Sequence, residues 1–333
     1  MLTLADVEGA AERLSGHARR TRVVGHPALD DRAGAVVQLK LECEQETGSF
    51  KFRGAYNTVS VLDADQRAAG VVTYSSGNHG QGVARAAQLA GTTAVVVMPH
   101  DAPAHKVART EAFGARLVRY DRYQEDRAAI AAGIAAEEGR AVVPPYDHYP
   151  VMAGQGTVAL ELLDQLSAPE AGVAARPGLG ALLVPLGGGG LLAGCATVIA
   201  GRDPGVRVYG VEPEAGDDHR RSRRAGHRID IGVPTTIADG QQVPTPGELT
   251  WPINDRLTTD FLTVTDEEIV ATMGLLHEHL GLMVEPSGAS AFAAVVHGRL
   301  PTSSSATAGT VAVVVSGGNI GPDRFRELTG LSI

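Results

Sequence analysis

Short apolar runs rich in β-branched residues alternate with Ala-rich amphipathic stretches along most of the chain. The apolar runs predict buried strands at 36–41, 71–74, 94–98, 117–120, 141–143, 182–186, 206–211 and 311–315. The stretches between them predict helices, among them 80–90, 125–137 and 153–165. Because near-continuous apolar strands alternate with helices, the pattern predicts an α/β fold of parallel sheets with helices on both faces.

Two stretches test this pattern against other interpretations. Near the N-terminus, Thr3 and Asp6 have the spacing of a helix-capping pair, and no basic region precedes an apolar run, so we expect a helix and no secretory leader. Residues 181–201 form an uncharged stretch long enough to span a bilayer. Pro185 and the glycines at 187–190 interrupt it, so we expect a buried strand, a loop and a helix, and no membrane segment.

Composition and charge narrow the class of protein further. The 333 residues are 44% apolar and 20% charged, which is typical of a soluble globular protein. The 29 Lys and Arg residues against 38 Asp and Glu residues give a net charge of −9, which argues against a nucleic-acid or acidic-membrane partner. With only Cys43 and Cys195 present, we expect no disulfide framework and a cytoplasmic location.

The first candidate site is the run TGSFKFRG at residues 47–54, which places Lys51 between Phe50 and Phe52. The ordinary interpretation is an exposed cation beside core aromatics. An apolar setting would instead lower the pKa of the lysine and make its amine a nucleophile able to form a Schiff base. The run by itself leaves both interpretations open.

Three further runs of small and polar residues follow predicted strands, where open α/β sheets place ligands. Residues 75–82, SSGNHGQG, offer hydroxyls and helix N-terminal N–H groups to a carboxylate, although a simple helix cap is the alternative. Residues 187–190 are four glycines, which expose successive N–H groups to a phosphate. Ser316 opens the last run, SGGN, with a hydroxyl at the end of a strand.

A nicotinamide enzyme is the competing interpretation. Gly188, Gly190 and Ala193 fit a dinucleotide fingerprint, and Glu212 ends a later strand about twenty residues on. The fingerprint lies in the middle of the chain, however, and Pro185 stands at the end of the strand that leads into it. It also leaves the runs at 47–54 and 75–82 without a role.

Taken in this order, the four runs closely resemble the fold-type-II pyridoxal-phosphate enzymes of the serine/threonine dehydratase and serine racemase family. The resemblance extends from about residue 41 to residue 319. It implies a two-lobed α/β fold like that of the tryptophan synthase β subunit. The large, cofactor-binding lobe would comprise residues 1–62 and 149–333, and the small lobe residues 63–148. It also implies a homodimer.

The resemblance implies a role for each candidate residue. Lys51 would form the Schiff base with pyridoxal 5′-phosphate, with Phe50 packed beside it. Asn78 would bond the ring hydroxyl of the cofactor, and Ser316 its pyridine nitrogen. The residues expected to cradle the phosphate are Gly187, Gly188, Gly189, Gly190 and Leu191. Those expected to hold a small amino-acid substrate are Ser75, Ser76, Asn78, His79 and Arg127.

The expected activity is that of an ammonia-lyase that converts L-threonine or L-serine to a 2-oxo acid and ammonia. Lys51 would act as the base, and Ser76 matches the racemase residue that serves the opposite face of the substrate. Serine racemase and 3-hydroxyaspartate dehydratase remain alternatives. Gln241 and Gln242 stand where racemase-like members carry serines, which favours elimination over racemisation.

A metal site is expected after the predicted strand 206–211. Two carboxylates and a backbone carbonyl within one turn suit Mg²⁺ or Ca²⁺, whereas an acidic surface loop is the ordinary interpretation. The spacing of Glu212, Gly216 and Asp218 resembles the metal site of serine racemase-like members. It implies a structural divalent cation in the large lobe.

Overall fold

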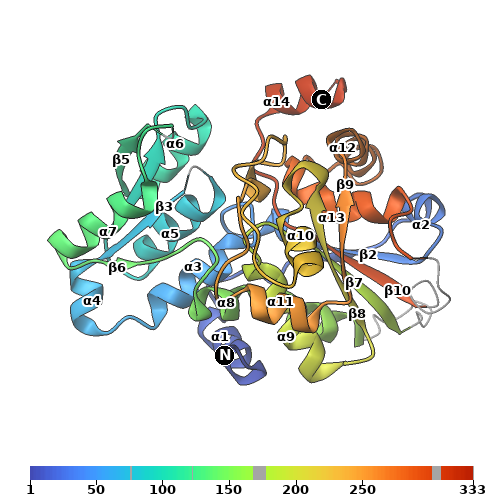
Figure 1. Ribbon diagram of the computed structural model, residues 1–333, viewed down its shortest axis with the longest axis horizontal. Helices are drawn as coiled ribbons and strands as arrows, with labels where there is room; N and C mark the ends of the chain where they lie inside the picture. Colours follow the sequence, from blue (N-terminus) through green and yellow to red (C-terminus); the bar gives the residue numbers. More distant parts are fainter. Residues whose placement is uncertain (76, 122, 168–177, 302–308, 333) are drawn as a thin grey trace.

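The structure is a computed structural model, and it describes residues 1–332 except residues 76, 122, 168–177 and 302–308 (Figure 1). The described strands form two separate sheets. The larger sheet has the order β1-β2-β10-β7-β8-β9, with strands at Val23–Val24, Val37–Leu41, Thr310–Val315, Leu179–Pro185, Arg207–Pro213 and Asp260–Val264. The smaller has the order β5-β4-β3-β6, with strands at Arg116–Tyr120, Ala94–Pro99, Val71–Tyr74 and Ala141–Val142.

Helices follow or separate these strands through the described part of the chain. The α-helices are α1 (Leu4–Leu14), α2 (Pro27–Ala33), α3 (Lys51–Ser60), α4 (Ala64–Ala69), α5 (Asn78–Leu89), α6 (Ala104–Ala112), α7 (Arg127–Glu138), α8 (Tyr149–Ser167), α9 (Gly190–Arg202), α10 (Asp218–Ala225), α11 (Trp251–Leu257), α12 (Asp266–Leu280), α13 (Pro286–Val296) and α14 (Pro322–Thr329). Three short 3₁₀ turns are η1 (Glu42–Glu44), η2 (Glu214–Gly216) and η3 (Asp239–Gln241). The predicted capping pair is confirmed, since the Thr3 and Asp6 side chains each accept the other's backbone N–H.

The predicted strands are confirmed, with the largest shift at the start of β7, which begins at Leu179 rather than at residue 182. Two strands were not predicted. β1 has only two residues, and β9 carries a polar residue at its start. The pairing is parallel throughout the named strands except between β1 and β2, so the prediction of parallel sheets is confirmed, and the two-residue β1 adds an antiparallel strand at one edge.

The larger sheet is covered on both faces, as the α/β pattern predicts. Along β10, Val311, Val313 and Val315 pack in a buried cluster with α12 and α13. The alternate residues Ala312 and Val314 pack in a second cluster with α8 and α9. Because side chains alternate across a strand, an all-apolar strand can serve two cores at once.

The smaller sheet has its own pair of cores. Val72, Val95 and Val97 pack against α7, and Val71 and Val96 pack against α5 and α3. Figure 1 shows the two sheets side by side, with α3 and α8 near their junction. The smaller sheet falls within residues 63–148, and the lobe boundaries proposed from the sequence stay a prediction.

Residues 181–201 form the end of β7, a glycine loop and α9, in the predicted order. Among the described residues, no helix combines the length and the apolar character needed to cross a membrane. The cytoplasmic location and the homodimer remain predictions.

Candidate active site

A pocket lies where the two sheets meet, and it contains residues from all four runs predicted as sites. Tyr74 at the end of β3, Pro185 at the end of β7 and Ser316 after β10 line it, so the carboxyl ends of strands from both sheets face it. The predicted residues that line it are Phe50, Lys51, Ser75, Asn78, His79, Arg127, Gly187, Gly188, Gly189, Gly190, Leu191 and Ser316. Ser76 lies outside the described residues.

Lys51 is the first residue of α3, and its side chain reaches across the pocket. Its Nζ donates a hydrogen bond to the carbonyl oxygen of Pro145 at 2.7 Å and lies 5.1 Å from the centre of the Phe50 ring. Burial lowers the pKa of Lys51 to about 8, although the charge of Glu285 partly opposes the shift. The amine is therefore much closer to its neutral, nucleophilic form than an exposed lysine.

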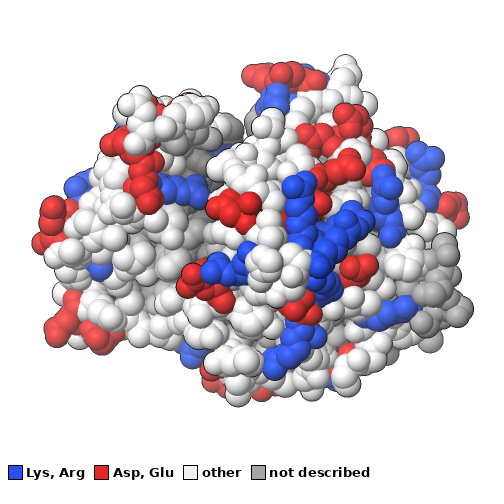
Figure 2. Space-filling view, in the orientation of Figure 1, with Lys and Arg blue, Asp and Glu red and all other residues white. Residues whose placement is uncertain are grey.

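Lys51 is one of only three lysines in the chain, and none of the three is a surface cation. Lys40 and Lys106 are both buried, and Lys51 is partly buried and lines the pocket. The positive charge of the surface is therefore carried by arginine. The basic patch over α10 in Figure 2 belongs to Arg220, Arg221, Arg223 and Arg224.

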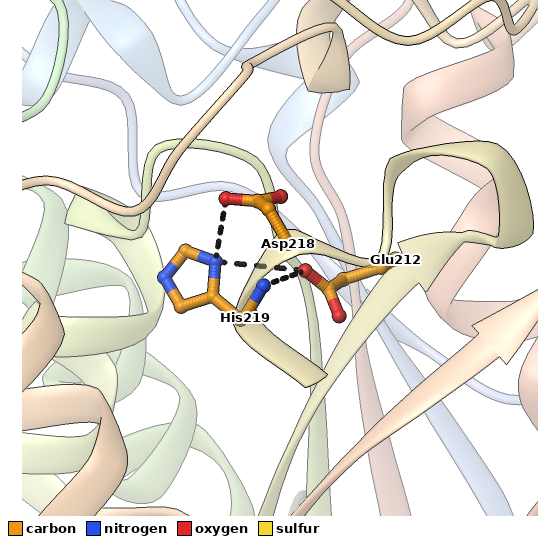
Figure 3. Close-up of side chains that lie close together, drawn as sticks. All are labelled: Glu212, Asp218 and His219. Atoms are coloured by element: carbon orange, nitrogen blue, oxygen red, sulfur yellow. Dashed lines mark hydrogen bonds and ion pairs between the residues drawn. The ribbon is translucent and has the colours of Figure 1, made fainter. Parts of the chain in front are cut away.

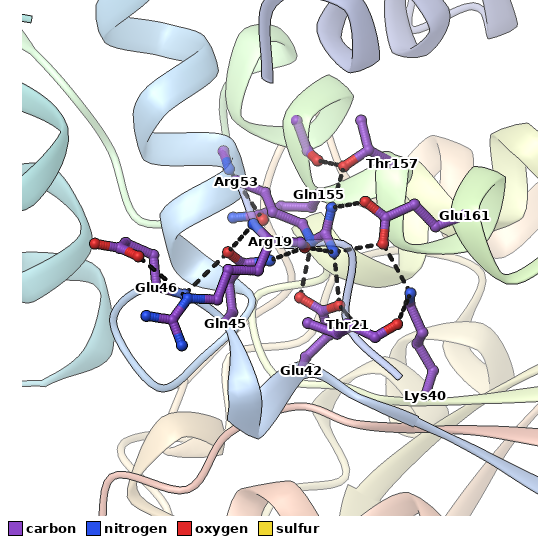
Figure 4. Close-up of polar contacts among 12 residues, drawn as sticks. Arg19, Thr21, Lys40, Glu42, Gln45, Glu46, Arg53, Gln155, Thr157 and Glu161 are labelled. Carbon is purple, nitrogen blue, oxygen red and sulfur yellow. Dashed lines mark hydrogen bonds and ion pairs between the residues drawn. The ribbon is translucent and has the colours of Figure 1, made fainter. Parts of the chain in front are cut away.

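A buried group of charges fixes the helix that carries Lys51 (Figure 4). Two residues along α3, Arg53 donates hydrogen bonds from Nε and Nη2 to both oxygens of Glu42, each at 2.8 Å. It donates from Nη1 and Nη2 to Glu161 of α8 at 2.7 and 2.8 Å, and Lys40 of β2 donates to the same carboxylate at 2.7 Å. Two cations and two anions thus join α3 to α8 and to strand β2 of the larger sheet.

The glycine loop between β7 and α9 has no room for side chains. A Cβ on Gly188 would lie 2.3 Å from the ring of Tyr146. Gly189 has a φ of +91°, and a Cβ there would lie 2.4 Å from Nδ2 of Asn254. Helix α9 begins at Gly190 without a side-chain cap, so its first N–H groups are free for a ligand. Such a cradle of backbone donors at a helix N-terminus fits a phosphate.

Helix α5 provides a second group of backbone donors in the same pocket. Its N-cap, Gly77, makes no side-chain capping bond. Ser75 accepts a hydrogen bond from the Gly77 N–H at 3.2 Å. His79 lies within the first turn and shares a 3.0 Å hydrogen bond with the carbonyl of Val143, and burial lowers its pKa to about 3. His79 is therefore neutral, and the helix N-terminus supplies the positive potential for an anion.

Asn78 connects two acidic or polar groups that were not predicted as site residues. Its Nδ2 donates to Oε1 of Glu285 at 2.5 Å, and its Oδ1 accepts from Nδ2 of Asn319 at 2.8 Å. Burial raises the pKa of Glu285 to about 7. The sequence marks Glu285 only as the residue before Pro286 at the start of α13, which is a helix signal and not a site signal.

Two further cationic side chains, Lys106 and Arg127, line the pocket, and only Lys106 is ion-paired among the described residues. Lys106 of α6 is ion-paired with Asp239 of η3 at 2.5 Å. Burial opposes its charge, but Asp239 and Glu285 outweigh this effect and raise the pKa of Lys106. Arg127, at the start of α7, lies 5.8 Å from the centre of the Tyr74 ring and forms no ion pair with the described residues. Its guanidinium is therefore available to an anionic ligand.

Ser316 lies directly after β10 and is buried, with its Oγ donating to the carbonyl of Ser287 at 3.2 Å. It presents a neutral hydroxyl to the pocket. A heterocyclic nitrogen bound there would have no carboxylate to keep it protonated.

The predicted metal ligands Glu212, Gly216 and Asp218 do not line the pocket, and the side chains of Glu212 and Asp218 lie close together with His219 (Figure 3). β8 extends to Pro213, so Glu212 belongs to the strand, and Asp218 is the first residue of α10. Their side chains are buried rather than part of an acidic surface loop, and Gly216 is buried in η2 between them. His219, which was not predicted, lies beside both carboxylates.

Comparison with known proteins identifies relatives over the whole chain. Residues 14–317 match the family model described as "Pyridoxal-phosphate dependent enzyme". An L-threo-3-hydroxyaspartate ammonia-lyase of Saccharomyces cerevisiae is 44% identical over 98% of this chain and 96% of its own length. A serine racemase of Schizosaccharomyces pombe is 41% identical over 97% of this chain and 96% of its own length.

Solved structures agree with this relationship. The structure of maize serine racemase covers 98% of this chain and 96% of its own, with a TM-score of 0.91 and 34% identity. The glycine cradle, the buried lysine and the neutral Ser316 also fit the phosphate, the aldehyde and the pyridine ring of one cofactor, whereas the nicotinamide interpretation leaves the lysine unused. The chain therefore belongs to the fold-type-II family of pyridoxal-phosphate dependent enzymes.

Proposed function

We propose that this protein is an ammonia-lyase whose substrate is a β-hydroxy amino acid with a second carboxylate, namely L-threo-3-hydroxyaspartate. The observation that carries the proposal is Arg127, which forms no ion pair with the described residues and lines the same pocket as the N-terminus of α5. The helix offers donors to the α-carboxylate, and Arg127 offers a charged fork to the second one. L-serine and L-threonine, the substrates expected first from the sequence, have no second carboxylate that could pair with Arg127. The similarity to a 3-hydroxyaspartate lyase supports the same substrate.

In this proposal Lys51 has two tasks. Its amine would hold the cofactor, and its Nζ would act as the base that takes the proton from Cα of the substrate. Bound pyridoxal phosphate supplies the electron sink that makes this proton acidic and lets the β-hydroxyl depart. The glycines from Gly187 to Gly190 would hold the phosphate, and Ser316 would offer the pyridine nitrogen a neutral hydroxyl; all of them line the pocket.

The overall reaction balances without an oxidant or a reductant. The Cα proton and the β-hydroxyl leave together as water, and hydrolysis of the released enamine returns one water as the keto oxygen. The products are oxaloacetate and ammonia.

A second candidate activity is serine racemisation, which the relative from Schizosaccharomyces pombe favours. Inversion at Cα requires a second acid–base group opposite Lys51. Ser76 stays the predicted residue for that role. If it acts so, Ser76→Ala abolishes any racemisation while most of the deamination of L-serine remains.

We also propose a divalent cation at Glu212 and Asp218, outside the pocket. Both side chains are buried, and neither carboxylate oxygen of Asp218 accepts a hydrogen bond from the described residues. Two buried carboxylates without a full set of donors fit a cation, with Gly216 proposed to add its carbonyl oxygen. Such an ion would brace the link between β8 and α10.

The test is a substrate panel with the cofactor-loaded protein. Release of ammonia and of the keto acid is measured for L-threo- and L-erythro-3-hydroxyaspartate, L-serine, L-threonine and D-serine. We expect kcat/KM for the L-threo diacid to exceed that for L-serine at least ~100-fold, the ratio given by about 3 kcal/mol of added transition-state binding. Equal or faster turnover of L-serine or L-threonine would contradict the diacid proposal and leave the family assignment intact.

A further inference from the structure

One ring nitrogen of the buried His219 faces the carboxylates of both Asp218 and Glu212 (Figure 3). Its Nδ1 is 3.4 Å from Oδ2 of Asp218 and 3.5 Å from Oε1 of Glu212. The exposed fractions of the three side chains are 0% for His219, 1% for Asp218 and 0% for Glu212. One donor atom from each residue lies within 4.8 Å of the other two.

The polar atoms of this cluster are not satisfied by the rest of the described chain. Neither ring nitrogen of His219 and neither carboxylate oxygen of Asp218 has a hydrogen-bond partner there. Glu212 is held in place by backbone donors, since its Oε1 and Oε2 accept from the N–H groups of His219 and Arg220 at 2.8 and 3.1 Å. Each oxygen of Glu212 keeps a lone pair for a further ligand.

Two aromatic rings pack against the imidazole of His219. The ring of Phe261 packs edge-on against the imidazole at a centroid distance of 5.5 Å, and the ring of Trp251 lies at 6.0 Å. With apolar neighbours on these sides, the nitrogen that faces the carboxylates is positioned as a donor atom toward the same point.

This donor set differs from the one that suits Mg²⁺ or Ca²⁺, which prefer oxygen ligands alone. An imidazole nitrogen beside two carboxylates suits the first-row transition metals. We infer that Nδ1 of His219 is a third side-chain ligand of the cation, and that the site selects Mn²⁺ over Mg²⁺ and Ca²⁺. The inference rests on the cation site proposed above and adds its metal class.

The competing arrangement is a metal-free cluster in which a protonated His219 neutralises the two carboxylates. Burial opposes that charge, but Asp218 and Glu212 outweigh it and raise the pKa of His219 to about 9. The positions of the three side chains are compatible with both the metal-bound and the metal-free arrangement. The experiment must therefore detect a bond between the metal and a nitrogen of His219.

The test uses the cofactor-loaded protein after treatment with a chelator. Mn²⁺, Mg²⁺ and Ca²⁺ are titrated separately by calorimetry, and the Mn²⁺ complex is examined by pulsed electron paramagnetic resonance. We expect Mn²⁺ to bind at least ~10-fold more tightly than Mg²⁺, with spin-echo modulation from one directly bound nitrogen-14. In His219→Asn the nitrogen signal disappears and Mn²⁺ affinity falls at least ~10-fold, while Mg²⁺ affinity stays within about threefold.

The matched control is His297→Asn, which removes an exposed imidazole and should change neither signal. If wild-type protein binds Mn²⁺ without nitrogen modulation, the cation site stands and His219 is not its ligand. If none of the three ions binds, the cation site itself is wrong and the metal-free cluster is correct. The wild-type spectrum decides the question even if the variant does not fold.

Discussion

Nζ of Lys51 donates a hydrogen bond to the carbonyl oxygen of Pro145, 2.7 Å away. A lysine held this way by a neutral carbonyl loses solvation without gaining a counter-ion, which is why its pKa falls to about 8. Two titratable groups face it: Glu285, whose charge opposes the fall, and His79, which is neutral because its own pKa lies near 3.

The rate at which the apoprotein takes up pyridoxal phosphate should therefore depend on pH. Only the neutral amine attacks an aldehyde, so the rate rises about tenfold per pH unit below pH 8 and levels off above it. Stopped-flow absorbance measures it. Glu285→Gln removes the charge that raises the pKa of Lys51, so its plateau should begin at a lower pH. A profile that still rises steeply at pH 10 would show an unperturbed lysine.

Replacement of the lysine tests its role directly. Lys51→Ala should lose the visible absorbance of the bound cofactor and at least ~10³-fold in kcat, because both the attachment point and the base are gone. Lys51→Arg is the matched control, since it keeps the charge but not the nucleophile, and it should be equally inactive. Turnover of Lys51→Ala at the wild-type rate would assign the chemistry to another residue.

A single methyl group added to the glycine loop is expected to weaken cofactor binding. In Gly188→Ala the new Cβ would lie 2.3 Å from the ring of Tyr146, so the loop must shift and the phosphate donors move with it. We expect a loss of about 1–3 kcal/mol in cofactor affinity, measured by fluorescence titration of the apoprotein. Gly133→Ala on α7 is the control, because nothing lies within 4 Å of its Cβ and affinity should not change. Equal affinity of the two variants for the cofactor would show that its phosphate does not bind at the glycine loop.

Arg127 should discriminate between substrates rather than support all of them. Arg127→Gln is expected to raise KM for L-threo-3-hydroxyaspartate at least ~10-fold, since the second carboxylate loses its cation, and to change KM for L-serine less than about threefold. Arg116→Gln, which removes an arginine of β5 that is ion-paired with Glu138 at the end of α7, is the control. Loss of activity toward both substrates would make Arg127 a structural residue.

The buried charges around Arg53 should be costly to break. Arg53→Met leaves the buried Glu42 and the partly buried Glu161 without their main counter-ion, and we expect the free energy of unfolding to fall by about 3–5 kcal/mol in urea titrations. Arg221→Met breaks a half-exposed helix pair with Asp217 and should cost less than about 1 kcal/mol. Similar losses in the two variants would show that the buried group is not a stabilising unit.

The parts of the site that could be predicted from the sequence are those formed by residues that follow one another along the chain. A strand, a glycine run and a helix follow one another from Leu179 to Arg202. The position of the glycine loop could therefore be predicted from the sequence without knowledge of the tertiary packing. The strands were clear for the same reason, because Val-rich runs such as β10 are apolar throughout. β9 was missed since its run, Asp260–Val264, is short and begins with a charge.

Residues that reach the pocket from distant segments could not be predicted. Lys106, Tyr146 and Glu285 line it only because α6, the segment before α8 and the start of α13 converge there. None of them belongs to a local pattern. His219 was missed for a different reason: the spacing of Glu212 and Asp218 already suggested an oxygen-ligand site, and nothing in the sequence shows that the next side chain turns inward.

The absence of surface lysines has a consequence for how this protein handles a reactive aldehyde. Pyridoxal phosphate condenses with any accessible primary amine, whereas the guanidinium groups that charge this surface do not form imines with it. Lys40 is buried in an ion-paired cluster and Lys106 is tied to Asp239, so Lys51 and the chain's α-amino group are the amines left to react. Reductive trapping should therefore label this protein almost stoichiometrically at one internal position, and excess cofactor should leave little background modification.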